Sequence, residues 1–401
     1  MTGAPSLDAE RLTIPQGHAW NRLPVIGAVV GGLGILASVA LGRSHPEQFF
    51  FSWLVAFLFF LSLALGGLFF VLTHFVTNAR WSVVVRRLAE NIMATLPLFI
   101  LLFIPIAIGM HDLFHWTHED AVAHDPLLQG KQGYLNQPFF LVRAAICLLV
   151  WTLMAWWFLR ASRRQDRTGE PGIRKRLIQI SAPGLFLFAI TVTVAAVDWI
   201  MSLDPHWYST MFGVYYFAGS LVGIFAFMAI MAAAMRRAGL LGPALTVEHF
   251  HDLGKLLFAF TVFWAYIAFS QYFLIWYANL PEETMWFLHR SEGSWKWVSM
   301  ALGWGHFAIP FLFLLSRNIK RRPGLLVPGA LWMLGIHLVD VYWLVMPTHH
   351  KHGVHLSLLD LTTFVGIGGL FLAVVGWRMR GHALIPIKDP LLEDSLRFEN
   401  L

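Results

Sequence analysis

The chain has 401 residues, of which 57% are hydrophobic and 13% are charged, and its mean hydropathy is +0.61. Soluble domains carry about 25% charged residues, so this composition excludes a soluble globular protein and is typical of a polytopic helical membrane protein. The single cysteine, Cys147, excludes an intramolecular disulfide, a cysteine-ligated iron–sulfur cluster and c-type haem attachment within the chain. The net charge of +6 would suit nucleic acid, but the basic residues gather in particular loops, so no nucleic-acid partner is expected.

Ten stretches are long and apolar enough for membrane-spanning helices, which need roughly 20 such residues. They are residues 23–42, 49–76, 92–110, 138–160, 180–202, 211–235, 253–279, 297–316, 325–346 and 354–377. The sequence therefore predicts an all-α polytopic membrane protein with a ten-helix membrane domain over 23–377. Residues 1–22 and 378–401 are expected to be a cytoplasmic amino-terminal segment and a cytoplasmic tail. The polar leader before the first stretch favours a retained helix over a cleaved signal peptide.

Lysine and arginine are distributed unevenly among the loops. The amino end, the even-numbered loops and the carboxyl tail contain 22 of them, whereas the odd-numbered loops contain 5. Because cytoplasmic loops are enriched in positive residues, this pattern predicts that both termini are cytoplasmic. The strongest clusters, in 160–176 and 317–322, are interpreted as orienting charges.

Two halves of the sequence have similar landmarks. Glu90 lies 70 residues before Arg160, and Glu248 lies 69 residues before Arg317. The fifth and ninth stretches each carry an aspartate near the same end. This spacing favours two repeat units, about 49–202 and 211–346, and hence two side-by-side four-helix bundles (helices 2–5 and 6–9) with two peripheral helices. Coincidence among similar apolar segments is the alternative.

Ionisable residues inside membrane spans are costly and are candidates for function. In the periplasmic half, including mid-depth, they are Asp198, His306, His337, Asp340 and Asp360. In the cytoplasmic half they are His74, Glu90, His249, His251, Asp252 and Lys255. His337 and Asp340 share a helix face, so we expect a histidine–carboxylate pair that passes protons between two half-paths. The alternative is that each residue is bonded to a neighbouring backbone or hydroxyl group.

Several histidines are also candidate ligands for a haem or a metal ion. His306 and His337 could be axial ligands of one b-type haem, although His337 already has a plausible carboxylate partner. His111, His115 and His118, and His349, His350 and His352, could bind a transition metal, but docking or solvation is the preferred interpretation and no metal site is predicted. The loop 111–137 is long for a bundle connection and is expected to be a docking surface. No motif for ordinary catalysis is present, so no catalytic residue is assigned.

Two unusual stretches carry a family resemblance. They are DWIMSLDPHWYSTMFG at 198–213 and FWAYIAFSQYFLIWYANLPEE at 263–283. The sequence resembles the ActF family, the smaller NrfD/PsrC-like integral membrane subunits of bacterial alternative complex III, a quinol:cytochrome c (or high-potential acceptor) oxidoreductase. The resemblance covers nearly the whole chain, from the first to the tenth stretch.

The resemblance implies ten helices in two four-helix bundles in the bacterial cytoplasmic membrane. It further implies a chain that binds no cofactor, alongside a larger NrfD-like subunit that oxidises quinol beside a periplasmic iron–sulfur protein. Multihaem and monohaem cytochromes c, a terminal oxidase and membrane lipid are the other implied partners, with haem c and iron–sulfur clusters in the partners. The chain's own implied role is a transmembrane proton path and scaffold.

Two other functions stay open at this point. The chain could bind quinol itself, with protons taken or the headgroup oriented by Asp198, Asp340, His355 or Arg143. It could instead be a stand-alone secondary transporter. Such proteins usually have inverted repeats and helices broken in mid-membrane, whereas this sequence predicts continuous helices and a repeat in the same orientation. Breaks would be sought at the prolines Pro97, Pro105, Pro183 and Pro310.

Overall fold

The computed structural model describes residues 12–400, so residues 1–11 of the expected amino-terminal segment lie outside the described part. Between residues 12 and 400 the structure contains helices and no strand. Ten helical segments in that range are long and apolar enough to cross a membrane. The predicted fold class, an all-α polytopic membrane protein, is confirmed.

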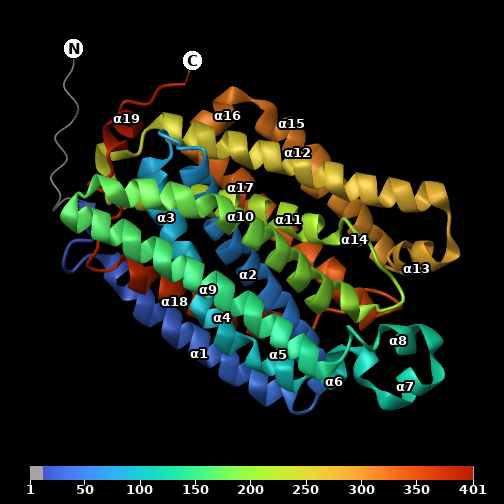
Figure 1. Cartoon of the computed structure of the whole chain (residues 1–401). Helices are drawn as coiled ribbons and strands as arrows, with labels where there is room; N and C mark the ends of the chain where they lie inside the picture. The colour runs from blue at the N-terminus through green and yellow to red at the C-terminus, as the bar shows by residue number, and fades with distance from the viewer. Residues whose placement is uncertain (1–11, 401) are drawn as a thin grey trace.

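All ten predicted spans are present, at the predicted places along the chain (Figure 1). In chain order the spanning helices are α1 (Leu23–Gly42), α2 (Pro46–Val76), α3 (Val83–Met93) with α4 (Leu96–Leu102) and α5 (Ile104–Ile108), α9 (Gln137–Thr168), α10 (Pro171–Trp199), α11 (Phe212–Arg237), α12 (Val247–Ala278), α14 (Trp295–Ala301) with α15 (Ile309–Leu315), α17 (Pro323–Val345) and α18 (Leu358–Met379).

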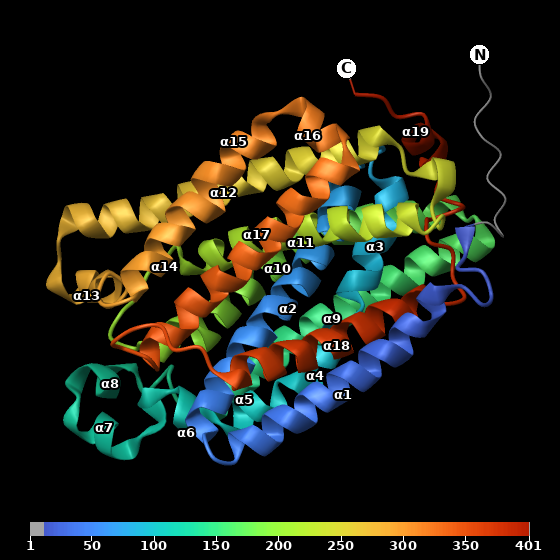
Figure 2. The same cartoon turned by 180° about the vertical axis from the view of Figure 1, so that it is seen from behind.

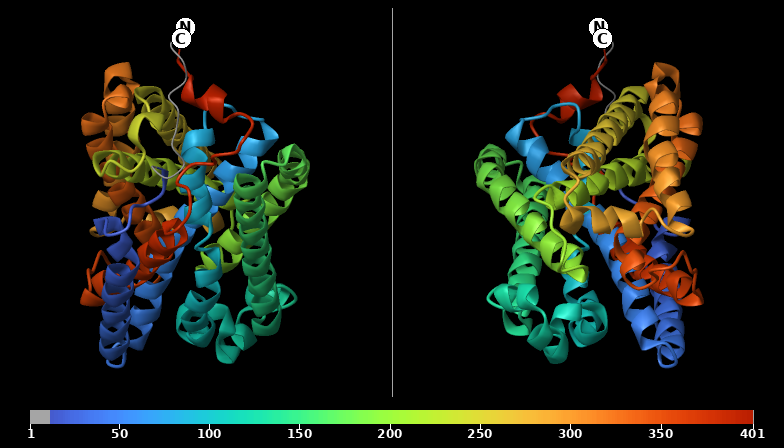
Figure 3. Two further views of the ribbon diagram at one scale, coloured as in Figure 1. Left: turned by 90° about the vertical axis from the view of Figure 1, so that its left-hand side faces the viewer. Right: turned by 90° about the vertical axis from the view of Figure 1, so that its right-hand side faces the viewer.

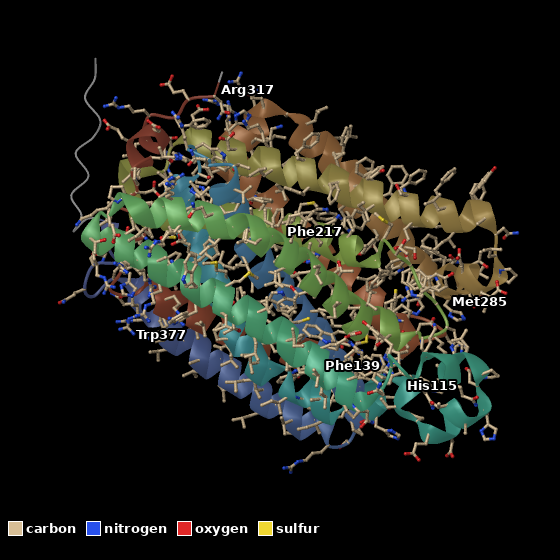
Figure 4. The ribbon with its side chains drawn as sticks, in the orientation of Figure 1. His115, Phe139, Phe217, Met285, Arg317 and Trp377 are labelled. Carbon is tan, nitrogen blue, oxygen red and sulfur yellow. The ribbon has the colours of Figure 1, made fainter. Side chains whose placement is uncertain are left out.

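Short helices occupy the connections between the spans and the segment after the last span. They are α6 (Met110–Leu113), α7 (Glu119–His124), α8 (Pro126–Lys131), α13 (Pro281–His289), α16 (Arg317–Arg321) and α19 (Leu392–Leu396). Helices α7 and α8 form a small lobe that projects from one end of the molecule, and His115 marks its base in Figure 4.

Several helices are longer than the apolar stretches that predicted them. The third span begins at Val83 instead of 92, α10 begins at Pro171 instead of 180, and α9 ends at Thr168 instead of 160. The added turns are rich in charged residues, which hydropathy excludes from a span although they continue the helix. Hydropathy therefore predicts the apolar part of each spanning helix but not where the helix begins or ends.

Two spans are interrupted, so the expectation of continuous helices is wrong for them. Pro97 and Pro105 each lie in the first turn of a new short helix, α4 and α5, where a missing N–H costs nothing. In the eighth span a π-helical turn, Leu302–Ala308, separates α14 from α15 just before Pro310. Pro183 lies inside α10 without ending it.

The helices pack as two bundles joined along α2 and α11. Helix α2 contacts α3 and α10, and α9 packs on α10 and α4; α11 contacts α12 and α17, and α12 packs on α15 and α16. The end-on views show α9 and α10 on one side of the molecule and α12 with its partners on the other (Figure 3). Helix α2 is buried over nearly its whole spanning length and forms the centre.

The first and last spans, α1 and α18, pair with each other outside the two bundles (Figure 2). Their contact is lined by glycines: a Cβ added at Gly31 or Gly34 of α1 would lie 2.6 Å from the backbone of α18. Small residues at this spacing let two helices approach closely in a membrane. Ten crossings place residue 12 and residue 400 on the same side, where the amide of Leu384 donates to the carbonyl of Leu12 at 2.8 Å.

Candidate proton-transfer site in the membrane

A compact group of polar side chains lies at mid-depth in the second bundle, between α11, α12 and α17. Helix α17 supplies His337 and Asp340, which share a face as predicted, and the π-helical turn of the eighth span supplies His306. All three are buried, with at most 1% of their surface exposed. Ionisable groups are rarely placed so deep in a membrane protein unless they serve a function.

Asp340 is held by two hydrogen-bond donors from neighbouring helices. The hydroxyl of Tyr215, on α11, donates to Oδ1 at 2.6 Å, and the indole N–H of Trp264, on α12, donates to Oδ2 at 3.1 Å. These bonds fix the carboxyl group between three helices. Because a carboxyl accepts with both oxygens but can also take a proton, Asp340 is placed to gain and lose one without losing its position.

His337 occupies a recess that glycines create on α11. A Cβ at Gly219 would lie 2.9 Å from the imidazole Cε1, and one at Gly223 would lie 3.0 Å from its Cδ2. Its Nε2 lies 2.9 Å from the hydroxyl of Ser62 on α2, and that hydroxyl donates to the carbonyl of Phe59. Since the hydroxyl proton is already committed, the fitting tautomer has Nε2 as the donor.

His306 owes its position to the π-helical turn. Pro310 has no N–H, and its ring would collide with the carbonyl of residue 306, so the helix widens here instead of continuing as a regular α-helix. The indole of Trp332 donates to the freed carbonyl of Gly305 at 2.7 Å. The imidazole of His306 stacks on Trp264 with centroids 3.7 Å apart and planes at 18°.

The expected His337–Asp340 hydrogen bond is not formed. Asp340 binds Tyr215 and Trp264, whereas Nδ1 of His337 and both ring nitrogens of His306 are buried without a hydrogen-bond partner. One imidazole nitrogen from each of His306 and His337 and one carboxylate oxygen of Asp340 nevertheless lie within 4.8 Å of one another. This separation is longer than a hydrogen bond, so proton transfer among them would need a bridging water molecule.

The same three residues are the only group among residues 12–400 whose donor atoms converge as a metal ion would require. Two histidines and a carboxylate suit zinc or non-haem iron. A haem between the two histidines does not fit, because the Trp264 ring lies directly on His306 and Phe59 packs 5.5 Å from the His337 ring. These rings occupy the space that a porphyrin would need.

A cavity of about 500 Å³ lies beside this group, between α12, α13 and the start of the eighth span. Tyr215 and Trp264 line it and also bind Asp340, so the carboxyl group is one hydrogen bond away from the cavity. The rest of the wall mixes aromatic, polar and small or aliphatic side chains. It includes Gln271, Phe287, Arg290, Ser299 and Trp343.

Arg290, which sequence reasoning did not single out, forms part of that wall. Its guanidinium donates to the carbonyls of Trp343 and Leu344 at 3.2 and 3.0 Å, and to that of Trp286 at 3.1 Å. It thereby caps the carboxyl end of α17, where free carbonyls attract cations. Burial lowers the pKa of Arg290 to about 9. Because this value is still above neutral pH, the guanidinium stays charged.

Two predicted periplasmic residues lie away from the central group. Asp198, at the end of α10, is buried and bound by Arg143 of α9 at 2.6 and 3.2 Å. Asp360 belongs to the capping box that starts α18: it accepts from the amide of Ser357 at 2.9 Å and from the hydroxyl of Ser52 at 2.5 Å. Both arrangements have a sufficient structural reason.

The predicted cytoplasmic residues of the first bundle form a dense buried ion-pair cluster. Arg86 donates to Glu90 at 2.9 Å, to Nε2 of His74 at 2.9 Å and to Asp389 at 2.7 Å. Arg174 also donates to Asp389, at 2.9 Å to each oxygen. Burial alone would raise the pKa of Asp389, but Arg86 and Arg174 outweigh it and hold the value below the usual range.

The second bundle has the other cytoplasmic candidates at the start of α12. His249 completes a capping box with Thr246, whose amide lies 3.2 Å from its Nδ1. Asp252 forms an ion pair with Lys255, and His251 beside them is buried. Among residues 12–400 no hydrogen bond connects either of these two groups to the central group, so the structure separates the predicted set into local clusters.

Among residues 12–400, the histidines in the connections between the spans do not converge on a metal site. The rings of His111 and His118 stack 4.0 Å apart, and Nε2 of His118 lies 2.7 Å from the carbonyl of His111. Nε2 of His350 lies 2.7 Å from Oε1 of Gln48, and burial together with His349 and His355 lowers the pKa of His350 to about 4. This histidine is therefore a neutral structural donor at physiological pH.

Sequence reasoning missed the groups that hold the candidate site together. Tyr215, Trp264 and Ser62 come from helices distant in sequence and are common residue types in membrane spans. The one local signal was the i, i+4 spacing of Tyr215, Gly219 and Gly223, which marks one face of α11.

No known family model matches the sequence, and no curated protein matches it either.

Proposed function

We propose that this chain is a membrane subunit of a respiratory quinol:cytochrome c, or high-potential acceptor, oxidoreductase of the alternative complex III type. In this proposal it holds no redox centre itself and contributes a transmembrane proton path and a scaffold. The electron carriers belong to its partners: the larger NrfD-like subunit, a periplasmic iron–sulfur protein and the cytochromes c. The membrane would be the bacterial cytoplasmic membrane.

The observation that carries this proposal is the buried group of His306, His337 and Asp340. Three titratable side chains with unpartnered imidazole nitrogens lie within 4.8 Å at mid-depth, which is how proton relays in membrane proteins are built. Nearby, Tyr215 adds a hydroxyl that can pass a proton between Asp340 and the cavity. Water molecules would have to complete the path toward both ends.

A second candidate, a quinol-binding subunit in its own right, is favoured by the cavity. Its volume of about 500 Å³, the aromatic side chains in its wall and the polar groups of Gln271 and Arg290 suit a ring with two polar oxygens. A quinol bound there would have Tyr215 as its route to Asp340. Loss of quinol oxidation on changing Asp340 would favour this candidate over the first.

A stand-alone transporter is less well supported, although the interrupted third and eighth spans remove one argument against it. The interruption at His306 is a single π-helical turn within a helix that continues on both sides. Transporter sites usually use helices broken in corresponding positions of inverted repeats. Here the bundles are proposed to be parallel repeats.

The proposed orientation places both termini in the cytoplasm, because 22 of the lysines and arginines lie on that side and 5 on the other. We expect an alkaline phosphatase reporter to be active when fused after residue 125, in the α7–α8 lobe, and inactive after residue 170, between α9 and α10. A green fluorescent protein fused at the same positions should give the reverse pattern. Phosphatase activity at 170 would overturn the orientation.

Membership of a redox complex is tested by purifying the tagged full-length chain from its native membrane in mild detergent. We expect haem absorbance and iron to co-purify with it, together with quinol-dependent reduction of cytochrome c. Since the chain has one cysteine and no c-type haem motif, any covalently bound haem must come from a partner. A chain that is pure, stable and free of haem and iron would sink the proposal.

The same purification can locate the docking surface. The lobe is fixed by Lys131, which donates to the carbonyl of Pro205 at 2.5 Å, and by the Asp125–His206 pair, so residues 119–124 can be replaced by a short glycine–serine linker without disturbing the spans. We expect this variant to insert normally and to lose the iron–sulfur partner. Full retention of the partners would assign docking to another surface.

A further inference from the structure

A basic pocket of about 680 Å³ lies where α9, α18 and the segment after α18 meet, on the side of the chain ends. Four arginines line it, together with one tryptophan and one histidine. They are Trp156, Arg160, Arg163, Arg167, Arg378 and His382. This pocket is distant from the central His306 group, and its properties do not depend on the proposed function.

Within the described residues 12–400, no carboxylate is paired with the arginines of this pocket. Asp166 is the one carboxylate in its lining, and it forms an ion pair with Arg87. Within residues 12–400, none of the four arginines forms an ion pair with a carboxylate. The pocket therefore has a surplus of positive charge.

Two of the guanidinium groups have unmet hydrogen-bonding capacity. Nη2 of Arg163 donates to the carbonyl of Arg378 at 2.6 Å, but the Nε atoms of both arginines are buried without a partner. A buried donor without an acceptor costs free energy. Arg163 and Arg378 both line the pocket, and the guanidinium groups of lining arginines offer the planar fork of N–H donors that suits a phosphate oxyanion.

His382 indicates the same positive field. Burial, followed by the charges of Arg163, Arg87 and Arg378, lowers the pKa of this histidine below its usual value. A neutral imidazole adds a hydrogen-bond donor to the pocket without adding charge.

The surface of α9 leads from the pocket into the apolar part of the membrane. One stripe at heptad spacing contains Ile146, Leu149, Leu153 and Trp156, each at least half exposed, and continues through Arg160, Arg163 and Arg167. From Ile146 to Trp156 the stripe is about 15 Å long at 1.5 Å per residue, which matches half of a hydrocarbon core of about 30 Å.

Aromatic side chains mark the level where the apolar stripe gives way to the basic pocket. Trp156 is 52% exposed on α9 and lies beneath Arg160, whose guanidinium is 5.1 Å from the ring. Trp377 is 58% exposed at the end of α18, beside Arg378, and is labelled in Figure 4. Exposed tryptophans at this level are typical of the membrane interface.

We propose that this pocket binds the phosphate headgroup of an anionic phospholipid, with the lipid's acyl chains lying along the exposed apolar stripe of α9. Arg163 and Arg378, which are half-buried in the wall, supply guanidinium donors, and the exposed Arg160 and Arg167 supply charge at the rim. The continuous stripe of apolar, aromatic and basic residues favours a whole lipid over free phosphate. Basic pockets between spanning helices bind such headgroups in other membrane proteins.

The test measures lipid binding to the purified full chain in mild detergent by native mass spectrometry. The probes are dioleoyl phosphatidylglycerol, dioleoyl phosphatidylcholine and inorganic phosphate. We expect phosphatidylglycerol to remain bound and phosphatidylcholine and phosphate to be lost. In Arg163→Gln/Arg378→Gln the affinity for phosphatidylglycerol should fall by roughly fivefold for each arginine removed.

A matched control removes two arginines that lie outside the pocket at the same end of the molecule. Arg237→Gln/Arg322→Gln changes exposed residues and should leave phosphatidylglycerol binding unchanged. If the pocket variant does not fold, Arg160→Gln tests the same site at an exposed position. Equal binding in pocket and control variants, equal binding of phosphatidylcholine, or retention of free phosphate alone would each overturn the proposal.

Discussion

Replacing Asp340 by asparagine is expected to lower the proton-to-electron ratio of the assembled complex while quinol oxidation continues. The amide has nearly the volume of the carboxyl group and can still accept a hydrogen bond from Tyr215, so the fold should persist. It cannot take up a proton at neutral pH. Removing a positioned proton-transfer group slows the proton step by roughly 10²–10⁴-fold, so proton movement through this chain should become negligible.

The measurement compares proton uptake per electron for wild type, Asp340→Asn and Asp340→Glu in sealed vesicles. Asp340→Glu keeps a titratable carboxyl group and should retain part of the coupling. Tyr215→Phe removes a hydroxyl that binds Asp340 without removing the carboxyl, and should give an intermediate ratio. Equal ratios in all four complexes at normal assembly would mean that the buried group is structural and the chain is a scaffold.

The membrane architecture could be predicted from the sequence because hydropathy reports one physical property directly. A stretch of about 20 apolar residues has few other uses, and all ten spans were found. The helix ends were missed because residues such as Arg86 and Glu90 satisfy each other inside the protein, which a count of charges does not reveal. For the interrupted third and eighth spans, the sequence indicates only where a break could occur, at Pro97, Pro105 and Pro310, and not that the helix is interrupted there.

The candidate site was predicted in part. Three of the predicted residues, His306, His337 and Asp340, do converge, because mid-depth position and a shared helix face can be read from spacing. Their partners could not be predicted, since Ser62, Tyr215 and Trp264 come from three other helices and depend on how those helices are rotated.

Capping residues account for part of the difference between prediction and structure. The sequence predicts His249 and Asp360 as members of the proton path because they are ionisable and lie in or close to spans. Each satisfies a free backbone amide in a capping box at the start of a helix. A polar residue in the first turn of a spanning helix therefore has a structural explanation that is absent at mid-helix positions such as Asp340.

Replacing Asp389 by asparagine is expected to release the carboxyl-terminal segment and to destabilise the whole chain. Asp389 is the shared partner of two buried arginines, Arg86 and Arg174, which belong to different spans. Removing one partner of a buried ion pair leaves an uncompensated charge and costs about 3–5 kcal/mol. The segment 380–400 should then become accessible to protease, and the thermal unfolding midpoint in detergent should fall by several degrees.

The tail offers a matched control in Asp394→Asn, which removes the same charge from an exposed pair with Arg80. Exposed pairs are worth about 0–1 kcal/mol, so its protease sensitivity and unfolding midpoint should stay near those of wild type.

The depressed pKa of Asp389 also predicts a pH dependence of stability. The contribution of Asp389 to the free energy of unfolding is complete above the pKa of a free aspartate, about 3.9, and is lost as pH falls through the lower pKa of the folded state. Wild type should therefore lose its advantage over Asp389→Asn only below about pH 4. If Asp389→Asn and Asp394→Asn had the same unfolding midpoint at neutral pH, the buried cluster around Asp389 would not be what anchors the tail.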